Sequence, residues 1–170
     1  MQDDNAFRVA SFNLLNLALP TTVFYNRRQY SQADYEKKKD WVSRQLTTLN
    51  ADVIGFQEVF DEAALREIVE AHPLYQGAHI VMGERKGGAP AVALLSRYPV
   101  VEQHSYREFP EQLCVDDMTV PYREFSRPVL EAKVQVRPDL ALHVYVAHLK
   151  SKRPLLPDGV DRRDPRELAK

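Results

Sequence analysis

A short apolar run within residues 51–58 places the strongest constraint on how this chain can fold. The run 53–56 holds four apolar or small residues in succession, which is typical of a strand buried on both faces. Glu58 follows at the carboxyl end of this strand, and Asp61 begins a helical pattern beyond it. Ligands of open α/β sheets collect outside the carboxyl ends of the strands. We therefore expect Glu58 to hold a metal ion or to accept a proton.

The composition fits one soluble domain. Of the 170 residues, 44% are hydrophobic and 28% are charged, and the net charge is −1. Such a balance gives no general attraction to polyanions, so any phosphate site must come from a local patch. The N-terminus shows no signal peptide, and no apolar run approaches the roughly 20 residues of a membrane span. We expect a soluble protein, cytoplasmic by default, with the compartment unassigned.

Residue periodicity predicts a mixture of helices and strands. Residues 14–30 show no clean period and are expected to form a long loop. Lys37, Lys38 and Lys39 are expected on the solvated side of a helix, and 96–99 in a structural turn. The predicted strands cover 7–13, 52–57, 79–82, 91–96, 127–136 and 140–147, and the predicted helices cover 32–50, capped by Ser31, and 61–72, capped by Asp61.

Three predicted strands end in a polar side chain, namely Asn13, Glu58 and His148. If these strands are neighbours in one sheet, the three side chains meet at one edge. A carboxylate and an amide oxygen suit Mg²⁺, which takes one or two carboxylates and keeps several waters. A histidine beside them could donate hydrogen bonds to phosphate or act as an acid or base. Each residue alone is more often structural, so the interpretation depends on the combination.

Four motifs extend this combination along the chain. They are Ser-Phe-Asn-Leu-Leu-Asn at 11–16, Asp-Val-Ile-Gly-Phe-Gln-Glu-Val at 52–59, Ala-Leu-Leu-Ser-Arg-Tyr-Pro at 93–99 and Val-Ala-His-Leu-Lys-Ser at 146–151. In order and spacing, over residues 7–153, the chain resembles the endonuclease/exonuclease/phosphatase superfamily. The resemblance implies an α+β fold, the DNase I-like four-layer αββα sandwich, of which this chain supplies about the N-terminal half.

The resemblance also implies roles for individual residues. Glu58 matches the family's metal-binding glutamate, and Asn13 matches an asparagine that helps to organise the metal and the phosphate. His148 matches the histidine that supports the scissile phosphate. Arg127 occupies the place where some members hold an arginine against substrate phosphate, with a surface ion pair as an equal alternative. The implied cofactor is Mg²⁺, with Mn²⁺ as an alternative.

Two family motifs do not occur in this sequence, a Gly-Asp-Phe-Asn type and a Ser-Asp-His type. We therefore expect 1–170 to be the N-terminal part of such a domain, with a basic, proline-containing tail at 150–170. The resemblance places most of the second sheet in the C-terminal half, which would leave the inner face of the first sheet uncovered. The chain alone is then expected to be unstable or to associate, unless a C-terminal half or second chain completes the fold.

The sequence favours a Mg²⁺-dependent phosphoester hydrolase of the phosphodiesterase or endonuclease type, inactive as this chain alone. One alternative is a phosphomonoesterase acting on phosphoinositides or small phosphate esters. Another is a catalytically silent half-domain that serves in binding or assembly. The partner is a phosphate ester, and nucleic acid stays open as a partner because the basic groups over 150–166 could form a local patch or a solvated tail.

Overall fold

A computed structural model describes residues 6–25, 28–113 and 123–149, so the basic tail at 150–170 lies outside the described residues. No helix in these ranges is long and apolar enough to cross a membrane. In chain order the elements are β1 Val9–Leu17, α1 Gln32–Leu49, β2 Val53–Val59, α2 Glu62–Ala71, η1 Pro73–Tyr75, β3 His79–Met82, β4 Ala91–Ser96, β5 Val100–Glu108, η2 Glu111–Leu113, β6 Glu124–Arg137 and β7 Leu140–Val146.

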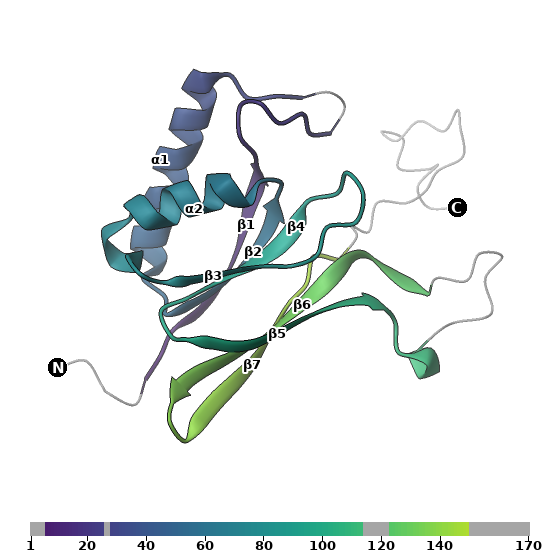
Figure 1. Ribbon diagram of the computed structural model, residues 1–170. Helices are drawn as coiled ribbons and strands as arrows, with labels where there is room; N and C mark the ends of the chain where they lie inside the picture. Colours follow the sequence, from purple (N-terminus) through teal and green to yellow (C-terminus); the bar gives the residue numbers. More distant parts are fainter. Residues whose placement is uncertain (1–5, 26–27, 114–122, 150–170) are drawn as a thin grey trace, which may run out of the picture.

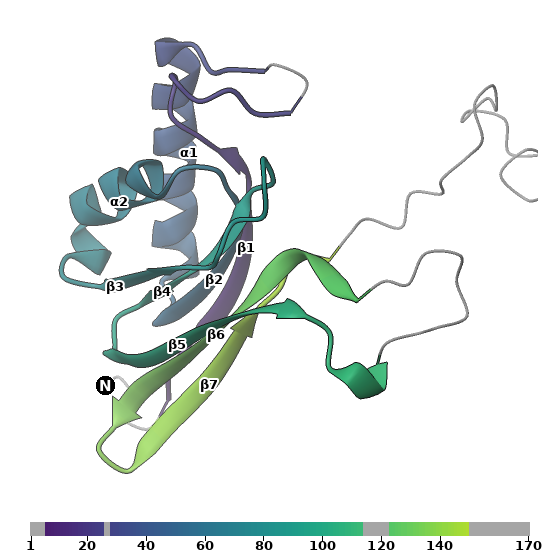
Figure 2. The ribbon, with the colours of Figure 1, turned by 45° about the vertical axis from the view of Figure 1, so that its right-hand side comes forward.

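The strands form two sheets that pack face to face. The first sheet has the order β1-β2-β4-β3, in which β1 runs parallel to β2 and the other pairs are antiparallel. The second sheet is antiparallel with the order β5-β6-β7. Helices α1 and α2 lie on the first sheet, on the side away from the second sheet (Figures 1 and 2). These are three layers of the expected αββα sandwich, and the α+β class is confirmed.

Both helices form where apolar periodicity predicts them, and α1 begins at its predicted cap. Ser31 begins α1, and its Oγ accepts a hydrogen bond from the Asp34 amide at 3.1 Å. Asn50 ends α1 in the left-handed conformation with φ 39°, which asparagine tolerates better than most residues. Helix α2 ends before Pro73, because the residue before proline resists helical geometry. The apolar faces of both helices are buried on the first sheet; their buried residues are Tyr35, Val42, Leu46, Ala64, Leu65, Ile68 and Val69.

Strand β2 is buried on both faces, as its apolar run predicts. Ile54 and Phe56 pack into the core beneath the helices, and Val53 packs into the core between the sheets. Gly55 also faces the second sheet, where a Cβ atom would lie 3.1 Å from Cγ2 of Val146. The two sheets therefore approach each other closely where β2 carries no side chain.

The second sheet covers the inner face of the first at β2 and β4, so the expectation of an uncovered inner face is wrong there. On β1 the expectation holds, because Val9 and Ser11, in register with Val53 and Gly55, stay exposed. Val53 and Leu94 of the first sheet have no exposed surface, and they share a core with Leu130 and Val134 of β6. The reason is that β6 and β7 form a hairpin with one apolar face, and that hairpin turns back over the first sheet. No described helix lies on the outer face of the second sheet (Figure 2).

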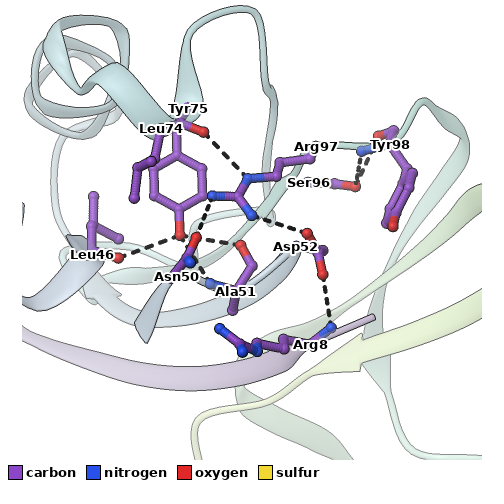
Figure 3. Close-up of polar contacts among 10 residues, drawn as sticks. All are labelled: Arg8, Leu46, Asn50, Ala51, Asp52, Leu74, Tyr75, Ser96, Arg97 and Tyr98. Carbon is purple, nitrogen blue, oxygen red and sulfur yellow. Dashed lines mark hydrogen bonds and ion pairs between the residues drawn. The ribbon is translucent and has the colours of Figure 1, made fainter. Parts of the chain in front are cut away.

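Arg97, in the turn after β4, ties three segments together (Figure 3). Its guanidinium donates to Asp52 Oδ1 at 3.0 Å, to Asn50 Oδ1 at 2.9 Å and to the Leu74 carbonyl at 3.2 Å. The same group lies 4.7 Å from the centre of the Tyr75 ring. The turn at 96–99 is therefore structural, as the sequence indicates, and it fixes the amino end of β2 against the end of α1.

We expect Arg97→Lys to lower the free energy of unfolding by about 1–3 kcal/mol, because a lysine cannot reach all three acceptors and leaves some of them unpaired. Denaturant unfolding measures the loss. Arg44→Lys, at an exposed position of α1, is the matched control and should change stability by less than about 0.5 kcal/mol. Equal effects of the two substitutions would contradict the role of Arg97.

We expect Gly55→Val to destabilise the fold by about 1–3 kcal/mol, because the new side chain overpacks the contact with Val146. Combining it with Val146→Ala should recover part of that loss, since the smaller residue makes room. Urea unfolding of the two single variants and the double variant gives the coupling energy. Strict additivity of the two effects would show that the sheets do not meet at this point.

Candidate functional site

The candidate site begins at paired irregularities in β1 and β2. Strand β1 continues to Leu17, so the prediction of a loop from residue 14 is wrong for its first four positions. Between the pairs Asn13↔Gln57 and Leu17↔Val59, three residues of β1 face Glu58 alone. Bulges of this kind bend a strand and redirect its side chains. Both Asn13 and Glu58 are therefore turned by irregular backbone at the carboxyl ends of two parallel strands.

Three residues at these bulges have left-handed backbone although none is glycine. Leu15 has φ 50°, Asn16 has φ 64° and Glu58 has φ 64°. Such conformations cost free energy and persist only where the surrounding contacts stabilise them, and they cluster at functional sites. The strain here lies directly beside the predicted metal ligand.

Asn13 and Glu58 contact each other directly. The Asn13 amide donates from Nδ2 to Glu58 Oε1 at 3.1 Å, and Asn13 Oδ1 accepts from the Leu15 amide at 2.8 Å. In this arrangement the amide oxygen faces the backbone while the amide nitrogen faces the carboxylate. Asn13 therefore orients Glu58, and Glu58 offers the charged oxygen atoms to a ligand.

Two residues that the sequence did not single out for the site support the strained turn. The Tyr30 hydroxyl donates to the Asn16 carbonyl at 3.0 Å, and Lys38 Nζ donates to the Leu15 carbonyl at 3.1 Å. Lys38 also lies 4.7 Å from the centre of the Trp41 ring. The prediction of a fully solvated lysine run is therefore wrong for Lys38, whose side chain reaches across the end of β1.

The carboxylate of Glu58 influences both supporting residues. Burial raises the pKa of Tyr30, and the Glu58 charge raises it further. Burial lowers the pKa of Lys38, and Glu58 opposes that shift. One carboxylate therefore acts on a neighbouring hydroxyl and a neighbouring ammonium group, which shows how closely the polar groups gather here.

His148 reaches the same point from the second sheet. It follows β7, so the three strands that end in Asn13, Glu58 and His148 are not neighbours in one sheet, and the site lies between the two sheets. His148 Nε2 lies 3.7 Å from Glu58 Oε1, and each side chain is only 19% exposed. Burial lowers the pKa of His148, the Arg127 charge lowers it further, and Glu58 opposes both. Burial and the Arg127 charge therefore favour the neutral imidazole over the charged one.

Arg127 lies on β6 beside His148. Its Nη2 donates to the Tyr25 hydroxyl at 3.2 Å, and within the described ranges it forms no ion pair with a carboxylate. Two nitrogen atoms of this region, Arg127 Nε and His148 Nδ1, are buried without a hydrogen-bond partner among the described residues. Buried polar groups are normally paired, so both side chains keep unused hydrogen-bonding capacity.

The donor set at Glu58 fits a metal ion that keeps most of its water. Among the described residues, no group of three or more His, Cys, Asp or Glu side chains gathers to hold a metal. One partly buried carboxylate is enough for Mg²⁺, which is commonly bound through one or two carboxylates, waters and substrate phosphate. Glu58 therefore fits as a ligand, and Asn13 fits as the residue that orients it.

Asp61 does not act as the predicted side-chain cap of α2. Its carboxylate makes no cap hydrogen bond, although Asp61 occupies the cap position. Instead Asp61 Oδ2 accepts from the Leu19 amide at 2.8 Å, and the Leu17 carbonyl accepts from the Phe60 amide at 2.8 Å. These bonds hold the chain after β1 against the chain after β2, next to the bulges.

The two-sheet sandwich, with a polar site where both sheets end, defines a DNase I-like fold. The sequence profile of the Endonuclease/Exonuclease/phosphatase family matches residues 10–166. The chain belongs to this family, whose members are phosphoester hydrolases and generally use divalent metal ions. No curated protein sequence matches the chain significantly.

Solved structures show the same fold at low sequence identity. Beta toxin of Staphylococcus aureus, as a β-hairpin deletion mutant, is similar with a TM-score of 0.54 and 17% identity over 91% of this chain and 55% of its own. A humanized D. rerio TDP2 has a TM-score of 0.54 and 15% identity over 86% and 49%. ANGEL2, a 2′,3′-cyclic phosphatase, has a TM-score of 0.52 and 18% identity over 82% and 40%. The chain spans about half the length of these structures.

We expect the His148 imidazole to titrate below its ordinary value of 6.5. Arg127→Gln should raise this pKa, because it removes a positive charge, and Glu58→Gln should lower it, because it removes a negative one. NMR titration of the histidine ring protons measures both shifts. Lys133→Gln, which removes a charge elsewhere on β6, is the control and should leave the titration unchanged. Shifts of the opposite sign would contradict the geometry of the site.

Proposed function

We propose that this chain carries one side of the active site of a Mg²⁺-dependent phosphoester hydrolase of the phosphodiesterase or endonuclease type, with Mn²⁺ as an alternative metal. The observation that supports it best is the meeting of Asn13, Glu58 and His148 from two different sheets. Glu58 lies 3.1 Å from Asn13 Nδ2 and 3.7 Å from His148 Nε2. Family membership supports the reaction class.

Each residue has a role that its chemistry supports. Glu58 would hold the metal ion, which when bound polarises the phosphate and stabilises its negative charge. Asn13 holds the Glu58 carboxylate in place. His148, in its neutral form, donates a hydrogen bond to a phosphate oxygen, and Arg127 places a positive charge beside that oxygen. Together they bind and orient the phosphate and stabilise the charge that develops on it.

The remaining machinery is proposed to come from a C-terminal half or a second chain, because the Ser-Asp-His type of motif that would activate water does not occur in this sequence. The outer face of the second sheet is the surface on which such a half would pack. There Tyr106 and Tyr145 are 39% and 59% exposed and both donate to Glu131. A complementing layer of helices would cover this face.

A catalytically silent half-domain is the second candidate function, because two of the family's motifs do not occur in the chain. The coding sequence downstream of Lys170 and its neighbouring genes distinguish the two candidates. The two missing motifs, in frame or in a separate gene, would favour the enzyme. Their absence from both places would favour the silent module.

We expect the chain to bind Mn²⁺, used as a probe for Mg²⁺, and Glu58→Gln to weaken that binding at least about tenfold, since it removes the charged ligand. Electron paramagnetic resonance of free Mn²⁺ measures the affinity. Glu131→Gln is a matched control, because Glu131 is also a strand carboxylate with a side chain only 15% exposed. Equal affinities of wild type and Glu58→Gln would rule out Glu58 as the metal ligand.

The chain alone is expected to be inactive, and its complex with a polypeptide that carries the missing motifs is expected to hydrolyse phosphoesters. Assays on plasmid DNA and on small phosphate esters, with Mg²⁺ and with a chelator, identify the substrate class. Activity of the complex that survives both the chelator and Glu58→Gln would overturn the proposed mechanism.

A further inference from the structure

An apolar pocket of about 390 Å³ opens directly beside Arg127 and His148. Phe109, Phe125 and Val129 line it, and Phe109 and Phe125 pack edge to face with ring centres 4.4 Å apart and planes inclined at 68°. The pocket therefore joins two kinds of surface, a polar end at the candidate phosphate site and an apolar wall that leads away from it.

Arg127 and His148 form the polar end of the pocket. Arg127 Nε and His148 Nδ1 are buried and have no hydrogen-bond partner among the described residues, and both residues line the pocket. An anionic oxygen in the pocket would accept a hydrogen bond from the Arg127 guanidinium, which has no carboxylate partner in the described ranges. A neutral histidine can donate from Nδ1 or Nε2, and an anion within reach favours the tautomer that donates to it.

The charges around the pocket indicate how many phosphates it can hold. Lys86, the other cation in the lining, forms an ion pair with Glu124 and also donates to the Phe125 carbonyl at 3.4 Å. Arg127 has no carboxylate partner in the described part of the chain. One uncommitted cation among the described lining residues matches one phosphate group.

We propose that this pocket binds the organic group of a phosphate ester whose single phosphate contacts Arg127 and His148, and that this group is apolar rather than a polyol. The proposal rests on the proposed function and specifies its substrate class. Leu149, which is 71% exposed, adds to the apolar lining. Ser126 and the ion pair of Lys86 with Glu124 also line the pocket. The wall formed by Phe109, Phe125 and Leu149 offers no hydrogen-bonding side-chain groups, so a sugar or glycerol hydroxyl placed against that wall would lose its water without compensation.

Equilibrium binding to the full 170-residue chain, with Mg²⁺ present, tests the proposal. The probes are phenyl phosphate, butyl phosphate, glycerol 3-phosphate and inorganic phosphate. We expect the two apolar esters to bind about tenfold more tightly than the other two, which corresponds to about 1.4 kcal/mol. A difference between phenyl and butyl phosphate then shows whether the pocket prefers a ring or an alkyl chain.

Two variants connect the preference to the pocket. Phe125→Ala should abolish the preference for apolar esters while inorganic phosphate binds as before. Leu149→Ser should weaken the preference for apolar esters without destabilising the core, because Leu149 is mostly exposed. Val101→Ser is the matched control, since Val101 is 56% exposed at the far end of β5.

The outcomes separate this proposal from the function on which it rests. Equal binding of all four probes, with Mn²⁺ binding still dependent on Glu58, would overturn the pocket and leave the hydrolase proposal standing. Binding of no probe, with Mn²⁺ binding still dependent on Glu58, would overturn the pocket proposal, whereas loss of both phosphate and Mn²⁺ binding would overturn the hydrolase proposal as well. Self-association that Phe125→Ala abolishes, with no ester preference, would show that a second copy occupies the pocket and would also overturn the proposal.

Discussion

Burial of β2 on both faces is the constraint on which the rest of the structure depends. Ile54 and Phe56 face the core beneath the helices, while Val53 and Gly55 face the second sheet. A strand in that position has no solvated face, so its sequence must be apolar throughout and small where the sheets approach. The sandwich can close because position 55 carries no side chain to collide with Val146.

The same burial explains where the polar site lies. Strand β2 can carry a charged side chain only where its regular pairing ends, and the bulge at Glu58 marks that point. The left-handed backbone at Glu58 turns the carboxylate to the carboxyl end of the sheets, where Asn13 and His148 meet it. Low exposure then makes each polar contact stronger than it would be in water. Strain, burial and proximity therefore coincide at one carboxylate.

Much of the fold could be predicted from the sequence, because it depends on local periodicity. The strand at β2, helix α1 with its Ser31 cap and the hairpin of β6 and β7 all follow from apolar spacing and turn residues. The position of that hairpin over the first sheet could not be predicted, because it depends on contacts between residues far apart in sequence. The resemblance placed most of the second sheet in the C-terminal half of the family's domain. This chain itself forms three strands of that sheet.

The residues of the candidate site were found through motifs, but their geometry was not. Leu15, Asn16 and Glu58 adopt left-handed backbone without being glycine, so no residue type signals the bulges. Lys38 is one of three adjacent lysines, and only the placement of α1 against β1 shows that it contacts the Leu15 carbonyl. Likewise, the sequence does not show which side-chain atom of Asn13 faces Glu58. In the structure the amide nitrogen faces the carboxylate, so Asn13 orients Glu58.

A crystal structure of the chain grown with Mn²⁺ tests the position of the metal most directly. The anomalous scattering of Mn²⁺ locates the ion without reference to any assumed ligand. We expect a peak within about 2.0–2.3 Å of a Glu58 carboxylate oxygen, with the remaining positions held by water. A peak bound at another carboxylate, with Glu58 still contacting only Asn13 and His148, would contradict the assignment of this end of the sandwich as the metal site.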